Sequence, residues 1–333
     1  MRVLLLPFLL LVTSCAYTTS VWMAPWEAAS IASAEQNHER IGELNPVWYS
    51  IAADGSIAVN WNGEKPVQAP GVRLVPTIQN VVKGSFDSSF AERLADPAYR
   101  LAHARALAEL VRAKQFDGID IDYERLPPTA RADFSNFITI LASQLHAQRK
   151  ELSVTIHPKT SDEQNWRGPG AQDWRFLGRV ADSIKIMAYD YHYDSSEGGP
   201  LSPLAWLEKI AAYADRTIKR KKVLIGLPWY GYDWQGTAAK PVSFDAARKL
   251  AEAEGATVQR DVNGEPFFTY ADHIVYYEDA ASYERQVQQV LRNHRSVAGI
   301  AHWHSGTEDP AVWEQVGKLR KRRLRLPWLI RKQ

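Results

Sequence analysis

The sequence predicts an α/β fold in which eight parallel strands alternate with helices and close into a TIM (β/α)8 barrel. Short runs rich in β-branched and apolar residues recur along the chain, and amphipathic stretches with helical spacing separate most of them. Strands that alternate with helices indicate βα units and a parallel sheet. The length of 333 residues would allow two domains, but one barrel with an insertion can also use it.

Each of the expected strands is short and apolar. The strands are predicted at Val21–Ala24, Pro46–Ile51, Arg73–Gln79, Gly118–Asp122, Leu152–Ile156, Ser183–Ala188, Val223–Leu227 and Val297–His302. Long helices are predicted at Pro97–Lys114, Thr129–Arg149, Leu204–Lys219 and Ala280–Asn293. In these helices apolar residues return every three or four positions, which is typical of a helix that packs one face on a sheet.

One connection is too long for a simple crossover, because about 67 residues separate Trp229 from Val297. We expect residues 235–278 to form a small α+β insertion between strands seven and eight, with a helix at Ser243–Glu254 capped by Ser243. Short strands are predicted at Thr257–Arg260, Pro266–Tyr270 and His273–Glu278. Barrel active sites are built from the loops after the strands, so the insertion should lie at the catalytic face.

The first fourteen residues resemble an export signal. Arg2 supplies the positive charge, and Val3–Val12 form an apolar segment too short to span a bilayer. The run Val12-Thr13-Ser14-Cys15 resembles the bacterial lipobox, which is cut before the cysteine that then carries lipid. Cys15 is the only cysteine, so no disulfide can form within the chain. The alternative is an ordinary signal peptide with an incidental cysteine.

Charge is distributed unevenly along the chain. The formal net charge is +2, but residues 318–333 contain eight Lys or Arg and no acid, which leaves an acidic body that argues against nucleic-acid binding. The barrel, residues 20–317, begins close to Cys15, so lipid and basic tail should both emerge at the bottom of the barrel and face the membrane. We expect a lipoprotein of the bacterial cell envelope, at the outer membrane if the cell has two. The alternative for the tail is a solvated end.

The segment Asp-Gly-Ile-Asp-Ile-Asp-Tyr-Glu at 117–124 carries the chemistry. On a strand, Asp120, Asp122 and Glu124 share one face and the isoleucines share the other. Crowded carboxylates repel one another, so one should keep its proton near neutral pH and could protonate a leaving oxygen. Glu124, at the strand's carboxyl end, is the candidate acid. A Mg²⁺ or Ca²⁺ site and a purely structural network remain alternatives.

These residues resemble the Asp-x-x-Asp-x-Asp-x-Glu signature of glycoside hydrolase family 18, which contains chitinases and related N-acetylglucosaminidases. Met187-Ala188-Tyr189-Asp190 resembles the family's sixth-strand motif, and Trp303 resembles its eighth-strand tryptophan. The stretches at 122–128, 157–159, 189–193 and 227–234 are most similar to the bacterial branch of spore cortex-lytic N-acetylglucosaminidases. That branch often has Asn where this chain has Asp120.

The resemblance implies hydrolysis of β-1,4-linked N-acetylglucosamine glycans, of peptidoglycan or chitin type, with retention and without a metal or cofactor. In this family the substrate's own N-acetyl oxygen attacks the anomeric carbon, an exception to the usual pair of catalytic carboxylates. By resemblance, Glu124 acts first as acid and then as base, and Asp122 orients the acetamido group. Asp120 would set the protonation of Asp122, and Tyr189 would position the attacking oxygen.

Four further residues are candidates for substrate binding. Trp303 would form the floor under the sugar, and Asp190 either contacts substrate or caps the chain locally. Trp229 and Tyr230 either line the cleft or pack under the insertion, and His157 is expected to be structural. The expected partner is an N-acetylglucosamine polysaccharide bound by a monomer. Two other functions remain open, namely a catalytically inactive sugar-binding protein and a metal-dependent barrel hydrolase.

Overall fold

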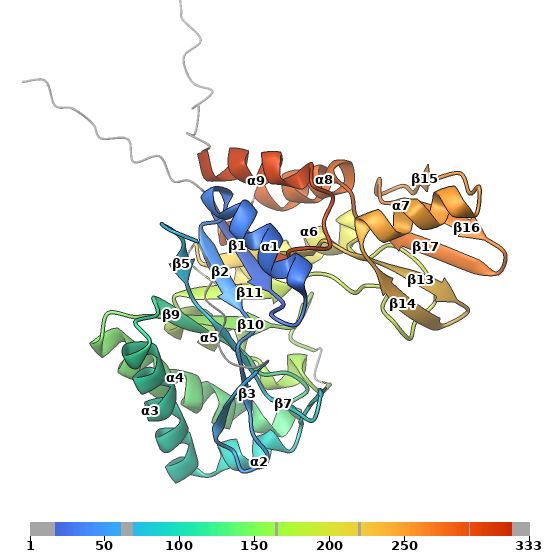
Figure 1. Ribbon diagram of the computed structural model, residues 1–333. Coiled ribbons are helices and arrows are strands. Elements are labelled where there is room, and N and C mark those ends of the chain that lie inside the picture. The colour runs from blue at the N-terminus through green and yellow to red at the C-terminus, as the bar shows by residue number, and fades with distance from the viewer. Residues whose placement is uncertain (1–16, 61–68, 164–165, 219–220, 293, 322–333) are drawn as a thin grey trace, which may run out of the picture.

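The computed structural model describes residues 17–60, 69–163, 166–218, 221–292 and 294–321 (Figure 1). The predicted signal peptide, Cys15 and most of the basic tail lie outside these residues. Within them, no helix combines the length and the apolar character needed to cross a membrane.

The barrel is built from parallel strands. They are β1 (Thr18–Met23), β2 (Glu43–Pro46), β3 (Tyr49–Ile51), β5 (Arg73–Leu74), β6 (Thr77–Gln79), β9 (Gly118–Asp122), β10 (Glu151–Ile156), β11 (Ser183–Met187), β12 (Val223–Pro228) and β18 (Val297–Trp303). In the described part of the chain these strands occupy eight positions in the barrel. β2 and β3 together form one position, and β5 and β6 together form another. β18 pairs in parallel with β1, and the sheet curls on itself. The predicted (β/α)8 barrel is confirmed.

Two barrel strands are interrupted where the sequence predicted continuous ones. The predicted strand Pro46–Ile51 is divided into β2 and β3, and Arg73–Gln79 is divided into β5 and β6. Proline has no backbone N–H, so the hydrogen-bond ladder cannot continue through Pro76 on its donor side. Its carbonyl still accepts from Asp120 N at 2.9 Å, which keeps the segment attached to β9.

Helices cover the outside of the barrel. They are α1 (Ala28–Gln36), α2 (Phe90–Ala95), α3 (Pro97–Ala113), α4 (Arg131–Ala147), α5 (Trp174–Val180), α6 (Leu204–Thr217), α8 (Ala280–Leu291) and α9 (Val312–Lys321), with short 3₁₀ turns η1 (His38–Arg40), η2 (Pro128–Ala130) and η3 (Pro169–Ala171). The four predicted long helices correspond to α3, α4, α6 and α8. Three short strands, β4 (Ile57–Val59), β7 (Val81–Val82) and β8 (Ser85–Phe86), were not predicted.

The alternation predicted for β9 places its two faces in different surroundings. Ile119 and Ile121 are fully buried in the apolar core beneath the helices. Asp120 and Asp122, at 0% and 4% exposure, occupy the other face, inside the barrel. The strand therefore carries apolar packing and polar chemistry on opposite sides, as a two-residue period requires.

The insertion is an antiparallel sheet with one helix. Its elements are β13 (Gly231–Gln235), β14 (Ala238–Val242), α7 (Phe244–Ala253), β15 (Gln259–Arg260), β16 (Pro266–Tyr270) and β17 (His273–Tyr277). The predicted cap is present, because the Ser243 side chain accepts a hydrogen bond from Ala246 N. The sheet begins at Gly231, four residues earlier than predicted, and a Cβ at Gly231 would lie 2.2 Å from the Tyr276 carbonyl oxygen. The insertion projects from one side of the barrel in Figure 1.

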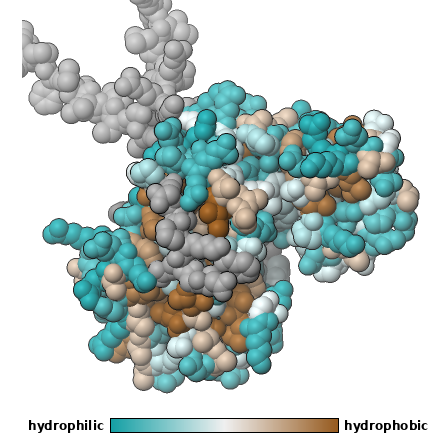
Figure 2. Space-filling view, in the orientation of Figure 1, coloured by the Kyte–Doolittle hydropathy of each residue, from teal (hydrophilic) through white to brown (hydrophobic). Residues whose placement is uncertain are grey.

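Both ends of the described chain lie at the amino-terminal face of the barrel. β1 begins there at Thr18, and near the end of α9 the Arg320 side chain donates to the carbonyls of Glu39 and Ile41, just before β2. Figure 2 shows hydrophilic side chains over α9 and the insertion, whereas hydrophobic side chains gather around β3 and β7.

Candidate active site

A pocket of about 170 Å³ opens at the carboxyl end of the barrel strands. Its lining residues come from seven strands or the loops that follow them. They are Trp22, Gln79, Phe86, Asp122, Glu124, Thr155, Met187, Tyr189 and Trp303. The structure thus brings together four predicted site residues that are far apart in sequence, at the face where barrel enzymes place their chemistry.

Glu124 lies at the edge of the pocket with its side chain 16% exposed. Burial raises the pKa of Glu124 well above its ordinary value, and the charges of Asp122 and Asp190 raise it further, against an opposing contribution from Arg125. A carboxyl group in these surroundings keeps its proton near neutral pH and can donate it to a leaving group.

The backbone of Glu124 is fixed by one buried side chain. Asn80 Oδ1 accepts from Glu124 N at 2.8 Å, and Asn80 Nδ2 donates to Glu124 O at 2.9 Å. The same amide donates to Asp87 O at 3.0 Å. Asn80 is fully buried, so this paired contact sets where the acid emerges from the end of β9.

Asp122 is almost completely buried and unequally bonded at its two oxygens. Its Oδ2 accepts from Gln79 Nε2 at 2.8 Å, whereas its buried Oδ1 has no hydrogen-bond partner. Burial and the neighbouring Asp120 raise the pKa of Asp122 to about 7, although the Gln79 hydrogen bond and Lys185 oppose the shift. Asp122 can therefore exchange a proton near neutral pH.

Asp120 lies one layer deeper and does not line the pocket. Its Oδ2 accepts from Trp22 Nε1 at 3.2 Å and from the Thr77 and Thr155 hydroxyls at 3.0 Å each. Its Oδ1 is 3.1 Å from the ammonium of Lys185. Asp120 therefore acts on substrate only through other residues.

Tyr189, Asp190 and Tyr230 form a connected group beside the acid. Burial raises the pKa of Tyr189 well above its ordinary value, so its hydroxyl stays neutral and able to donate into the pocket. Asp190 Oδ1 accepts from the hydroxyls of Tyr230 and Tyr232. Burial raises the pKa of Asp190 to about 6, against these two hydrogen bonds. Tyr230 is thus placed to hold Asp190 rather than to line the pocket.

The two predicted binding tryptophans have different surroundings. Trp303 is half-buried, lines the pocket and packs edge-on against Trp22 at 6.0 Å between ring centroids. Trp229 is 1% exposed, stacks on His302 at 4.3 Å and packs against Trp313. A ring buried in this way has no face left for a sugar, so the predicted substrate contact of Trp229 is replaced by core packing.

His157, expected to be structural, lies against the acid. Its Nε2 is 3.6 Å from Glu124 Oε2 and is buried without a hydrogen-bond partner. Gly168 leaves room for the ring, because a Cβ there would lie 2.5 Å from Nε2. Burial lowers the pKa of His157 to about 4, so at neutral pH the imidazole is an uncharged neighbour of Glu124.

Several supporting residues were missed by sequence reasoning. Gln79 ends the third predicted strand and Asn80 follows it, and a polar pair at the carboxyl end of a barrel strand was the available signal. Lys185 interrupts an apolar strand that was predicted to be buried, and a lysine there needs partners. Asp117, the first residue of the acidic segment, accepts from Leu74 N at 2.7 Å.

A metal site fits these residues poorly. Lys185 already places a positive charge beside Asp120, where a cation would have to bind. Across residues 17–321, in the parts that the structure describes, no three His, Cys, Asp or Glu side chains are grouped so as to hold a metal ion.

An α/β barrel whose mouth combines a proton-carrying carboxyl, a second titrating carboxyl and a half-buried tryptophan has the parts of a glycoside hydrolase. The sequence model of the Glycosyl hydrolases family 18 matches residues 59–308, and the chain belongs to this family.

Relatives and a solved structure agree with this assignment. The chain is 31% identical over 271 residues to YdhD of Bacillus subtilis, named as a sporulation-specific glycosylase, and 28% identical over 259 residues to the cortical fragment-lytic enzyme of the same organism. The matches cover 77% and 74% of this chain but only 63% and 60% of those proteins. A chitinase structure from Chromobacterium violaceum superposes with a TM-score of 0.84 at 25% identity, covering 92% of this chain and all of that one.

Proposed function

We propose that this glycoside hydrolase cleaves β-1,4-linked N-acetylglucosamine glycans, of peptidoglycan or chitin type, by substrate-assisted hydrolysis with retention. The observation that carries the proposal is the pair Glu124 and Asp122 at one pocket, both with raised pKa values. The names of the relatives support both glycan types, since one refers to sporulation, one to lysis of cortical fragments and one to a chitinase.

In the first step the protonated Glu124 gives its proton to the glycosidic oxygen, while the substrate's N-acetyl carbonyl oxygen attacks the anomeric carbon. The bond to the leaving sugar breaks, and a cyclic oxazolinium ion forms. Ionised Asp122 accepts a hydrogen bond from the acetamido N–H and balances the positive charge. Tyr189, beside Asp122 in the pocket lining, donates toward the acetamido oxygen.

In the second step Glu124, now ionised, takes a proton from water. The resulting hydroxide oxygen bonds to the anomeric carbon and opens the oxazolinium ring, which restores the acetamido group and the original anomeric configuration. One carboxyl group thus serves as acid and then as base, because its proton returns at the end of the cycle. Trp303 at the pocket edge supplies an apolar face for the sugar ring.

Replacing the acid tests the assignment. Glu124→Gln keeps the shape but removes the transferable proton, so kcat should fall by about 10²- to 10⁴-fold. Hydrolysis of chitin oligomers and of purified sacculi, followed by mass spectrometry of products, measures this for both substrates. The exposed Glu252→Gln, on helix α7 of the insertion, is the matched control and should retain full activity. Near-normal turnover by Glu124→Gln would exclude Glu124 as the acid.

Substrate assistance has its own test. A glycoside without the acetamido group lacks the internal nucleophile, so kcat/KM for glucose glycosides should be at least about 100-fold below that for N-acetylglucosamine glycosides. Matched chromogenic pairs measure the ratio. Equal values for the two sugars would contradict a mechanism that uses the acetamido oxygen. Binding of glycan without cleavage of any substrate would instead indicate a sugar-binding protein.

We also propose that Cys15 carries a lipid anchor in the bacterial cell envelope, assisted by the basic tail at 318–333. Two residues separate Cys15 from the start of β1, and β1 starts at the face opposite the pocket. The end of α9 lies at that same face through Arg320. An anchor there would leave the mouth of the barrel directed away from the membrane.

A further inference from the structure

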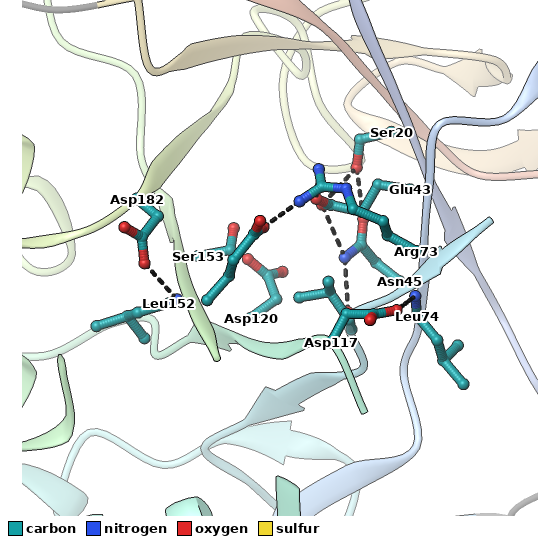
Figure 3. A network of polar contacts seen from close by, with 12 residues as sticks. Ser20, Glu43, Asn45, Arg73, Leu74, Asp117, Asp120, Leu152, Ser153 and Asp182 are labelled. Carbon is teal, nitrogen blue, oxygen red and sulfur yellow. Dashed lines mark hydrogen bonds and ion pairs between the residues drawn. The ribbon is translucent and has the colours of Figure 1, made fainter. Parts of the chain in front are cut away.

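A lysine lies inside the barrel beneath the catalytic carboxyls. Lys185, on β11, is completely buried, and its Nζ is 3.1 Å from Asp120 Oδ1 and 2.9 Å from Glu43 Oε1. The same ammonium donates to Ser153 Oγ at 2.8 Å. Figure 3 labels Asp120, Glu43 and Ser153, which come from the strands β9, β2 and β10. Lys185 thus binds two acids at once in a site closed to water.

In the described residues, the side chains that bind the Asp120 carboxylate are hydrogen-bond donors or carry a positive charge. The indole N–H of Trp22 can only donate, and it shares Oδ2 with the hydroxyls of Thr77 and Thr155. Lys185 takes Oδ1. Asp120 Oδ1 makes no hydrogen bond within the described structure, but a proton on it would break the ion pair with Lys185, so the geometry favours the ionised carboxylate.

Asp122, two residues along the same strand, differs from Asp120 because Lys185 pairs with Asp120 and not with Asp122. Only Gln79 donates to it, and the buried Oδ1 has no hydrogen-bond partner in the described structure. A bare carboxylate oxygen in such a site is costly, whereas a protonated one is not. The ionisable groups that act on Asp122 are Asp120 and Lys185 from below and Glu124 and Tyr189 at the pocket.

We propose that Lys185 is a positioning residue that holds Asp120 ionised and thereby confines the proton of the Asp120–Asp122 pair to Asp122, next to Glu124. Its catalytic consequence rests on the proposed function, because the proton on Asp122 must leave before that side chain can balance an oxazolinium charge. The protonation pattern itself does not depend on any substrate.

Further charges stabilise this buried lysine. Arg73 Nη2 is 2.6 Å from Glu43 Oε2, and Arg73 also pairs with Glu151, so charges alternate from Asp120 down to the amino-terminal face. Burial alone would lower the pKa of Lys185, but Asp120 and Glu43 outweigh it and raise that pKa above its ordinary value. Lys185 therefore stays charged throughout the range in which Asp122 titrates.

The test removes the positive charge beside Asp120 while keeping the net charge of the buried site unchanged. Lys185→Met alone would leave the buried Asp120 without a cation and Glu43 with Arg73 alone, which is strongly destabilising. The test variant is therefore the double substitution Lys185→Met with Glu43→Gln. Glu43→Gln alone is the matched control, because it keeps the pair between Lys185 and Asp120. Thermal unfolding confirms that each protein is folded.

The direct measurement is the ¹³C signal of the aspartate carboxyl carbons during a pH titration, with Asp120→Asn and Asp122→Asn used for assignment. In the wild type and in Glu43→Gln, Asp122 should titrate near neutral pH while the Asp120 signal stays that of an ionised group. In the double variant both signals should move together, and the last proton should leave the pair at a pH at least about one unit higher. An Asp120 signal that titrates in the wild type, or stays unchanged in the double variant, would overturn the proposal.

The rate profile supplies the catalytic readout. In the double variant, the rising limb of kcat/KM should move to higher pH together with the titration of the Asp120–Asp122 pair. In Glu43→Gln, the limb should stay in place or move to lower pH. A purely structural role for Lys185 would lower activity in both without moving the limb, which would also overturn the proposal. If the wild type cleaves no N-acetylglucosamine glycan, the proposed function fails, but the carboxyl titration still decides the role of Lys185.

Discussion

At the scale of single residues, Asp122, the last residue of β9, and Glu124, two positions beyond it, lie in different surroundings. Glu124 reaches the pocket edge, where burial and the charges of Asp122 and Asp190 hold its proton. Asp122 has one donor, Gln79, and titrates near neutral pH. The two groups therefore differ in protonation although they are only two positions apart, as their proposed roles of acid and charge-stabilising partner require.

These pKa values predict a bell-shaped pH dependence. kcat/KM should rise as pH increases through about 7, because Asp122 ionises there, and fall at higher pH, when Glu124 loses its proton. Gln79→Leu removes the donor that lowers the pKa of Asp122, so the rising limb should move to higher pH. Rates on a soluble N-acetylglucosamine glycoside from about pH 5 to about pH 9 measure both limbs. A rising limb that stays in place in Gln79→Leu would show that it belongs to another group.

The sequence identified the acidic residues but not the side chains that tune them. Asp120, Asp122 and Glu124 share a strand face, which the two-residue period reveals directly. Gln79 and Asn80 meet them across 43 and 44 positions of sequence, through contacts that exist only once β6 and β9 pair. Local sequence patterns do not reveal such long-range contacts, and for the same reason they could not decide whether Trp229 lines the cleft or packs in the interior.

At the scale of elements, the insertion is joined to the barrel through buried carboxyl groups. Glu265, just before β16, accepts from Leu201 N at 2.7 Å and from Ser202 N at 3.1 Å in the loop after β11. Glu278, just after β17, accepts from Ser282 and from Gln286 on α8. Burial raises the pKa of Glu265 to about 8, and burial with the charge of Glu265 raises the pKa of Glu278 well above its ordinary value.

This junction predicts a pH-dependent difference in stability. A carboxyl whose folded pKa is raised keeps a proton that the unfolded chain releases above about pH 4.3, so its contribution to stability declines as pH rises toward the folded pKa. Glu278→Gln removes that dependence, and its free energy of unfolding should therefore improve relative to the wild type between about pH 5 and about pH 8. Calorimetry at both pH values measures the difference. The exposed Glu284→Gln on α8 is the control, and equal pH responses of both variants would count against a buried protonated Glu278.

Elements with strong periodicity were predictable, and elements defined by pairing were not. The apolar stripes located α3, α4, α6 and α8, whereas α1 buries only Ser30 and Ala34 and so has no apolar stripe to detect. β14 contains Lys240 and Pro241, and it becomes a strand only through its pairing with β13. The division of the predicted strand Arg73–Gln79 into β5 and β6 could not be predicted, because it depends on which neighbouring strand each half pairs with.

At the scale of the whole molecule, the barrel separates its chemistry from its chain ends. The pocket lies at the carboxyl ends of the strands, and Thr18 and Arg320 lie at the other face. The fold class followed from the alternation of strands and helices in the sequence. The position of the last helix against the loop before β2 did not, because it depends on how the barrel closes.

The proposed anchor gives a cellular prediction. In a bacterial host, the wild-type chain should be recovered in the membrane fraction, and Cys15→Ser should move to the soluble part of the envelope while keeping its kcat/KM on soluble glycan. Fractionation with immunoblotting measures this, and removal of residues 322–333 separates the contribution of the basic tail. Unchanged membrane recovery of Cys15→Ser would argue against lipidation.

The placement of both described ends on one face also bears on how such barrels combine with other sequences. A segment joined before β1 or after α9 would leave from the side away from the pocket, so it could lengthen without narrowing access for a polymer. A linker at either end would therefore attach to the face opposite the pocket. The length of the linker would set how far the barrel can reach, without changing the residues that line the pocket.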